Sequence, residues 1–278
     1  MTFQGIHRTI IAVSLGLAAA AADARADIFT DDFTDNDYTQ ANWTFVSLGV
    51  RSNGAFDPLP ASGTAGAGQL HLTADAVSSP YVKHYAFGIV GNPPGSTIFD
   101  GPHTRIRAAV SWTQTQLDNR IAPNFVLRGN FSGVNAYHLN LDPGSSGTEL
   151  FSVWRTANSV GQRIKEGPDT ITYQADTVYN VEFGINGDSL WGKLWLGDNH
   201  DSPLAEISVI DDQIPWGAAS GNVLAGVMAE AGGAGQDAID ATFLGNTQFG
   251  DVLQVIPEPT TFALLALGGL ILARRKRP

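Results

Sequence analysis

The sequence predicts an all-β fold, a two-sheet antiparallel jelly-roll sandwich. Residues 27–254 contain almost no stretch with apolar residues at helical spacing, whereas short alternating or β-branched runs recur between Gly, Pro, Asn and Asp. About 12 strands in roughly 230 residues suit one sandwich domain. The chain is 43% hydrophobic, so it can bury a core. It has no Cys, and this excludes disulfides, thiolate metal sites and Cys nucleophiles.

Each predicted strand is a short apolar or β-branched run bounded by turn residues. The predicted strands are residues 27–33, 43–50, 69–74, 84–90, 104–113, 124–128, 136–141, 149–156, 178–185, 189–196, 205–210, 223–229 and 238–245. The clearest hairpin joins residues 179–185 to 190–196 through Asn186-Gly187-Asp188, because Asn-Gly readily adopts the positive φ angles of a tight turn. The Gly/Ala/Ser-rich stretches 61–68 and 231–235 predict surface loops.

The N-terminus predicts a secretory signal helix over residues 1–26. Two residues of basic type, His7 and Arg8, precede an apolar run over residues 10–22, and the small residues Ala24 and Ala26 stand before Asp27. This layout predicts cleavage by signal peptidase after Ala26. A retained anchor would need about 20 apolar residues, more than this run supplies.

The C-terminus has three parts that predict a membrane stop. A proline-rich motif, an apolar run over residues 262–273 and a basic tail follow one another; the motif is Pro257, Glu258 and Pro259, and the tail is Arg274, Arg275, Lys276 and Arg277. The order predicts a short transmembrane helix whose basic tail stays cytoplasmic. A helix of this length spans about 18 Å at 1.5 Å per residue, a minimal anchor for a hydrocarbon core of about 30 Å.

These last residues, from Val255 onward, resemble the PEP-CTERM sorting signal of exosortase systems in Gram-negative bacteria that make extracellular polysaccharide. The resemblance implies an inner-membrane intermediate, processing by an exosortase, and release or transfer of the body to the cell surface or biofilm matrix. Together, the N-terminal and C-terminal predictions divide the chain into a signal peptide (1–26), a body (27–254) and a sorting signal (255–278). The alternative is a plain tail anchor with an accidental Pro-Glu-Pro.

The charge excludes one class of partner. The formal net charge is −11, and residues 27–273, the chain without its first 26 and last five residues, keep 10 basic and 26 acidic side chains, a net charge of −16. Nucleic-acid binding needs a clustered basic surface, so no nucleic acid is expected.

The body resembles the concanavalin A-like lectin/glucanase and laminin-G-like superfamily. The segments that carry the resemblance are Asp31-Asp32-Phe33 with Trp43, residues 137–141, residues 179–183 leading into 187–195, Val209-Ile210-Asp211-Asp212, and residues 225–228. The resemblance implies two curved antiparallel sheets, with sugar bound on a concave face or at loop tips.

Period-two counting selects a candidate glycan-binding surface. Polar and aromatic side chains alternate with core residues on several strands, and they line one surface if those strands share a sheet. The candidates are Arg107, Arg128, His138, Glu182, Trp191, Lys193 and Trp195. The alternative is an ordinary solvated sheet face. Trp43, Trp112 and Trp216 are expected to be core or loop-anchoring aromatics.

No enzyme motif is present: HExxH, GxSxG, the P-loop and GxGxxG after a strand are all missing. Glycosidases need two placed carboxyls, and the nearest acidic strand, residues 181–185, offers Glu182 alone. A polysaccharide lyase using His138, Arg107 and Tyr137 is the other enzymatic option, although Tyr137 faces away from His138 by parity. A non-catalytic, polysaccharide-binding or structural matrix protein is therefore expected, with a secreted polysaccharide-degrading enzyme as the alternative.

Calcium is the one metal considered, and no other cofactor is predicted. Residues 31–37 hold many oxygen ligands, which hard cations prefer, but their spacing is not that of an EF-hand. The superfamily resemblance suggests a structural calcium site where the first and last strands meet, with Asp27, Asp31 and Asp240 as candidates. Ordinary Asx-turns are the alternative.

Overall fold

The computed structural model describes residues 29–34, 43–53, 55–90, 103–130, 135–144, 150–158, 160–168, 171–197, 202–215, 224–231 and 237–250. Residues 27–251 form one compact unit. The predicted signal helix, the predicted sorting motif with its predicted transmembrane helix, and Trp216 lie outside the described residues.

Two eight-stranded antiparallel sheets make up the fold. Sheet A runs in the order β14 (Ala205–Ile210), β13 (Ser189–Leu196), β12 (Tyr179–Asn186), β7 (His103–Ser111), β16 (Ile239–Gly250), β5 (Gln69–Ala74) and β4 (Ser62–Gly66), with β1 (Phe29–Asp31) beside β16. Sheet B runs in the order β11 (Val160–Glu166), β10 (Leu150–Ala157), β9 (Asn135–Asp142), β8 (Ile121–Asn130), β15 (Leu224–Ala231), β6 (Tyr81–Val90), β2 (Trp43–Arg51) and β3 (Phe56–Leu59).

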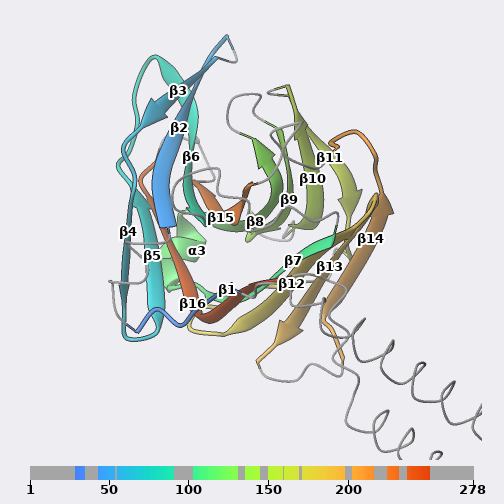
Figure 1. Cartoon of the computed structure of the whole chain (residues 1–278). Coiled ribbons are helices and arrows are strands. Elements are labelled where there is room, and N and C mark those ends of the chain that lie inside the picture. Colours follow the sequence, from blue (N-terminus) through green and yellow to red (C-terminus); the bar gives the residue numbers. More distant parts are fainter. Residues whose placement is uncertain are drawn as a thin grey trace, which may run out of the picture. The chain divides into compact units, whose positions relative to one another are not determined.

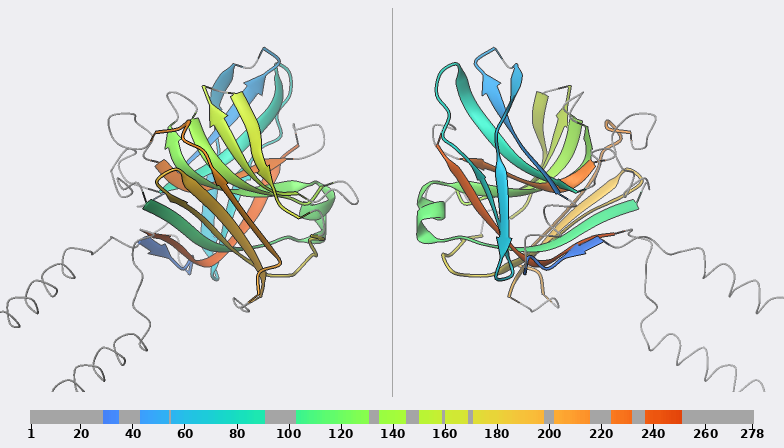
Figure 2. Two further views of the ribbon diagram at one scale, coloured as in Figure 1. Left: turned by 90° about the vertical axis from the view of Figure 1, so that its right-hand side faces the viewer. Right: turned by 60° about the vertical axis from the view of Figure 1, so that its left-hand side comes forward.

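The core lies between the two sheets because their strands alternate buried and outward residues. Phe125 of sheet B meets Phe243 of sheet A edge-on, with ring centroids 6.0 Å apart, and both side chains are fully buried. Sheet B is strongly curved: β2, β3 and β6 rise on one side, β9 to β11 on the other, and β15 and β8 lie between them (Figures 1 and 2). Its outer face is therefore concave.

The all-β sandwich prediction is confirmed, and every predicted strand overlaps an observed one. Three strands and one short helix were not predicted. The loop prediction for residues 61–68 is wrong, since residues 62–66 form β4 and pair with β5. In the predicted hairpin, Asn186 pairs with Ser189, so the two-residue turn is Gly187-Asp188, and Gly187 has a φ of 60°.

The helix α3 (Gln114–Asp118) fastens one end of sheet A. Thr113 caps it, accepting a hydrogen bond from the Gln116 amide at 3.2 Å and donating its own amide to Gln116 Oε1 at 2.8 Å. Gln116 Nε2 then donates to the Asp240 carbonyl at 3.0 Å. The capping pattern Thr-x-x-Gln is what starts a helix within an otherwise β-rich segment.

Candidate functional site

The concave face of sheet B carries the candidate site, which we call the groove. It encloses a cavity of about 160 Å³. One wall comes from β6 and its neighbours, the other from β9 and β10, and the floor from β15 and β8. Among the residues that line this cavity are Lys83, Tyr85, His138, Asn140, Trp154, Thr156, Met228 and Glu230.

His138 on β9 is held in one orientation by an asparagine pair beneath it. Asn124 donates its amide to the Ala122 carbonyl at 2.9 Å, so its Oδ1 is free to accept. That oxygen accepts from Asn140 Nδ2 at 2.9 Å and lies 3.2 Å from His138 Nδ1. His138 Nδ1 therefore carries the proton, and Nε2 is the acceptor, 3.4 Å from Thr156 Oγ1.

The groove keeps His138 uncharged. Burial and the nearby positive charge of Lys83 lower its pKa to about 3. At neutral pH the imidazole thus offers one lone pair at Nε2 to a hydroxyl donor.

An aromatic surface stands beside this acceptor. Trp154 on β10 lies directly opposite His138, with ring centroids 6.2 Å apart and planes inclined by 26°. The Trp154 indole N–H donates to Ser152 Oγ at 2.9 Å, which fixes the ring. Tyr85 stands on the far wall. Rigid ring faces of this kind stack on the C–H surfaces of sugars.

The groove's charged lining residues, among those described, form a pair. Lys83 Nζ is 3.0 Å from Glu230 Oε2 and 4.9 Å from the centre of the Tyr85 ring. Burial acts to lower the pKa of Lys83, but Glu230 and then Tyr85 outweigh it and raise that pKa above its ordinary value. Lys83 is therefore a cation whose charge is already compensated.

Glycine makes part of the floor. Gly226 lies on β15 between the outward residues Leu224 and Met228, and a Cβ there would overlap the carbonyl oxygen of Gly88 on β6. Only glycine allows β15 and β6 to approach so closely beneath the groove.

The seven glycan candidates do not share a surface, because their strands belong to two sheets. Of the seven, His138 lines the groove. Arg107, Glu182, Trp191, Lys193 and Trp195 lie on β7, β12 and β13, on the outer face of sheet A.

On sheet A, ion pairs and hydrogen bonds occupy the polar groups. Glu182 accepts from Arg107 Nε at 2.5 Å and from the Trp191 indole at 3.0 Å. Burial would raise the pKa of Glu182, but Trp191 and Arg107 together hold it below its ordinary value. Lys193 pairs with Glu206 at 3.0 Å. Trp195 is 8% exposed, so it offers little surface to a ligand.

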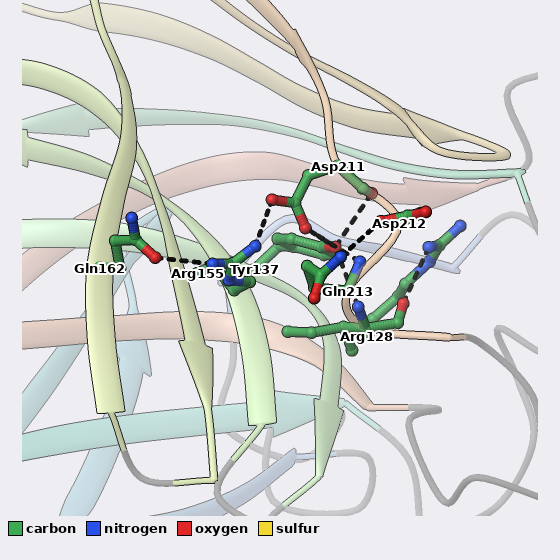
Figure 3. A network of polar contacts seen from close by, with 8 residues as sticks. Arg128, Tyr137, Arg155, Gln162, Asp211, Asp212 and Gln213 are labelled. Carbon is green, nitrogen blue, oxygen red and sulfur yellow. Dashed lines mark hydrogen bonds and ion pairs between the residues drawn. The ribbon is translucent and has the colours of Figure 1, made fainter.

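Arg128 leaves the groove because β8 bulges there. Its φ is 53°, and the register with β9 shifts between Leu127 and Asn130. The guanidinium of Arg128, which Figure 3 shows beside Gln213, instead donates to the carbonyls of Ile214 and Gly187. A bulge turns a side chain away from the face that alternation predicts.

Tyr137 belongs to the same inner network (Figure 3). Its hydroxyl donates to Asp211 Oδ1 at 2.6 Å and accepts from the Ile214 amide at 3.1 Å, while Arg155 Nη1 donates to Asp211 Oδ2 at 2.5 Å. The lyase trio therefore does not assemble: His138 faces the groove, Tyr137 the core and Arg107 the other sheet.

The calcium candidates do not meet. β1 and β16 do pair, but Asp31 lies opposite Thr247 of β16. Asp240 precedes Thr247 by seven residues on the same strand, about 23 Å at 3.3 Å per residue, and lies opposite Thr73 of β5. Asp27 is outside the described residues. In the ranges that the structure describes, no three His, Asp or Glu side chains gather as metal ligands. Asp32 forms the alternative Asx-turn, accepting from the Thr34 amide at 3.0 Å.

Comparison with known families concerns the C-terminus. Residues 255–277 match the family described as the PEP-CTERM protein-sorting motif. The chain carries a PEP-CTERM sorting signal. This signal indicates an exported protein that passes through a membrane-anchored intermediate in a Gram-negative bacterium. Within the described ranges, no helix has the length and hydropathy that a membrane span requires. No curated protein matches the sequence.

Solved structures show what kind of sandwich the body is. The exoplasmic/lumenal domain of VIP36 in its Ca2+/Man3GlcNAc-bound form is similar with a TM-score of 0.52 and 10% identity, over 82% of this chain and 90% of that one. The Ca2+-bound form of the same domain is similar with a TM-score of 0.51 and 12% identity, over 82% of this chain and 91% of that one. Peanut lectin with a 9mer peptide has a TM-score of 0.49 and 12% identity, over 82% of this chain and 98% of that one. The VIP36 similarity shows that the fold is a lectin-like jelly roll.

Sequence reasoning missed most of the groove. Tyr85 and Lys83 alternate with buried His84 and Ala86 on β6, and Trp154 alternates with Val153 on β10. Because residues on both faces of these strands are partly buried, the polar–apolar contrast that marks a solvated face is weak. One sequence signal could have pointed to the groove: Ser152, Trp154 and Thr156 alternate with their neighbours and so share one face of the predicted strand 149–156.

Proposed function

We propose that this protein is exported to the cell surface or extracellular matrix, where it binds polysaccharide in the groove without cleaving it. The sorting signal supports the destination, since the exosortase pathway implied by it serves exported proteins. The observation that best supports binding is the pair of Trp154 and His138, whose positions are fixed and which place a ring face beside an acceptor for hydroxyl groups.

The groove chemistry favours binding over hydrolysis. Glycosidases use two carboxyl groups, and among the described lining residues Glu230 is the one carboxylate, held in an ion pair. The exoplasmic/lumenal domain of VIP36, a structural neighbour, has a Man3GlcNAc-bound form. The proposal of sugar binding by this protein depends on the residues of its own groove.

A binding assay with matched tryptophan variants tests the proposal. The exported protein is titrated with polysaccharide from its own organism by affinity electrophoresis, beside Trp154→Ala and Trp191→Ala. We expect Trp154→Ala to weaken binding by about 5- to 150-fold, since stacking on one aromatic ring is worth on the order of 1–3 kcal/mol. Loss in Trp191→Ala with Trp154→Ala unaffected would place the site on sheet A, and release of shortened sugars would replace binding by catalysis.

A further inference from the structure

The groove has no net charge to offer a ligand. Lys83 and Glu230 neutralise each other at 3.0 Å, with side chains 38% and 18% exposed. His138 is uncharged at neutral pH, as its position against Asn124 and Lys83 requires. A charged sugar would therefore lose its hydration on entering without gaining a counter-charge.

The polar atoms that face the groove suit the hydroxyl groups of a sugar, which both donate and accept. His138 Nε2 and the Glu230 carboxylate accept hydrogen bonds, Thr156 Oγ1 and the Tyr85 hydroxyl can do either, and the side-chain amides of Asn130 and Asn135 contain both kinds of group. A neutral sugar brings hydroxyls that donate. A uronate carboxylate brings acceptors only, and it would face the Glu230 carboxylate. The net charge of −16 over residues 27–273 adds repulsion at longer range.

The cavity has the size of one ring. Its volume of about 160 Å³ is close to that of an engineered protein cavity, ~150 Å³, that takes up benzene. Trp154 and Gly226 are both among the residues that border this space.

From these three observations we propose that the groove selects an uncharged sugar ring and rejects uronates and other anionic sugars. The proposal rests on the proposed function, and it adds the class of glycan to it.

The test compares one polymer in two charge states. The neutral fraction of the organism's polysaccharide is bound before and after oxidation of its C6 hydroxymethyl groups to carboxylates. We expect oxidation to weaken binding by about tenfold or more at low salt. Tighter binding of the oxidised polymer, reversed by high salt, would overturn the inference while leaving the proposed function intact. Absence of binding to both polymers and to the acidic fraction would contradict the proposed function itself.

Two variants locate the selectivity in the ion pair. Glu230→Gln leaves the Lys83 charge uncompensated, so it should bind the oxidised polymer several-fold more tightly than the unmodified protein does, with the gain lost at high salt. The double variant Lys83→Met/Glu230→Gln has no charge and should keep the preference for the neutral polymer. Glu206→Gln breaks a pair of the same length on sheet A and should change neither affinity. If Glu230→Gln binds the oxidised polymer no more tightly than Glu206→Gln does, this role of the ion pair is refuted. Melting temperatures show that each variant is folded.

Discussion

His138 and Trp154 face each other across β9 and β10 on the concave side of sheet B, with their rings 6.2 Å apart. Each ring is fixed from below by a separate hydrogen bond, His138 by Asn124 and Trp154 by Ser152. A ligand therefore meets a surface that is already ordered, and binding costs little side-chain entropy.

The lowered pKa of His138 predicts a pH-dependent stability. Unfolded histidine binds a proton near its ordinary pKa of 6.5, whereas folded His138 does so near 3. The unfolded state thus binds more protons in this window, so the stabilising contribution is complete above pH 6.5 and is lost as the pH falls toward 3. Between pH 7 and pH 4, the free energy of unfolding should fall less in His138→Gln than in the unmodified protein. We expect the two falls to differ by on the order of 1–3 kcal/mol, as measured by urea unfolding.

The control for this comparison is His71→Gln, an exposed histidine on β5 of sheet A. If His138→Gln loses as much stability on acidification as the unmodified protein, the assignment of a neutral His138 is wrong.

Gly226 links the fold to the groove. Gly226→Ala places a methyl group against the Gly88 carbonyl, so β15 and β6 must separate. We expect a loss of about 1–3 kcal/mol in the free energy of unfolding, together with weaker polysaccharide binding. Gly66→Ala is the matched control, since a Cβ at Gly66 meets nothing within 4 Å. Equal stability of the two variants would show that the close strand approach does not require glycine.

The Tyr137 hydroxyl fastens the segment after β14 to sheet B. Tyr137→Phe removes one donated and one accepted hydrogen bond, to Asp211 and from Ile214. Leaving buried partners unsatisfied should cost about 1–3 kcal/mol in chemical denaturation, with the groove affinity unchanged. The control is Asp212→Ala, because exposed Asp212 contacts Gln213 at the chain's surface. A Tyr137→Phe protein as stable as this control would mean that the network in Figure 3 adds nothing.

The sorting signal predicts that the C-terminal tail is removed. In the native host we expect mass spectrometry to find the mature protein without Arg274 to Arg277. Replacing Pro257, Glu258 and Pro259 with alanine should leave the tail attached and hold the protein in the membrane fraction. Glu206→Gln, a change in the body, should be processed normally. An intact tail on the mature unmodified protein would contradict exosortase processing.

Much of the fold could be predicted because burial alternates along its strands. Arg107 and Ile106, or Glu182 and Phe183, fall on opposite faces as their parity requires. The unpredicted strands lie at sheet edges: β3 contains Pro58, β4 is rich in small residues, and β11 is almost wholly exposed. Edge strands tolerate such residues because one side of their backbone needs no partner.

The candidate site was predictable only in part, since alternation assigns a face but not a sheet. His138 and Glu182 have similar patterns around them, yet β9 and β12 belong to different sheets. The bulge that turns Arg128 toward Gly187 leaves no sign in the spacing of residues. Glu230 and Lys83 are far apart in the sequence, and pairing of β15 with β6 is what joins them.

The most direct measurement is an NMR titration of the tryptophan indole N–H signals with fragments of the organism's neutral polysaccharide. The chain has six tryptophans, and the proposed site involves Trp154. We predict that the Trp154 signal shifts in a saturable manner while those of Trp191 and Trp195 stay in place. Saturable shifts at Trp191 or Trp195 with Trp154 unmoved would contradict binding in the groove.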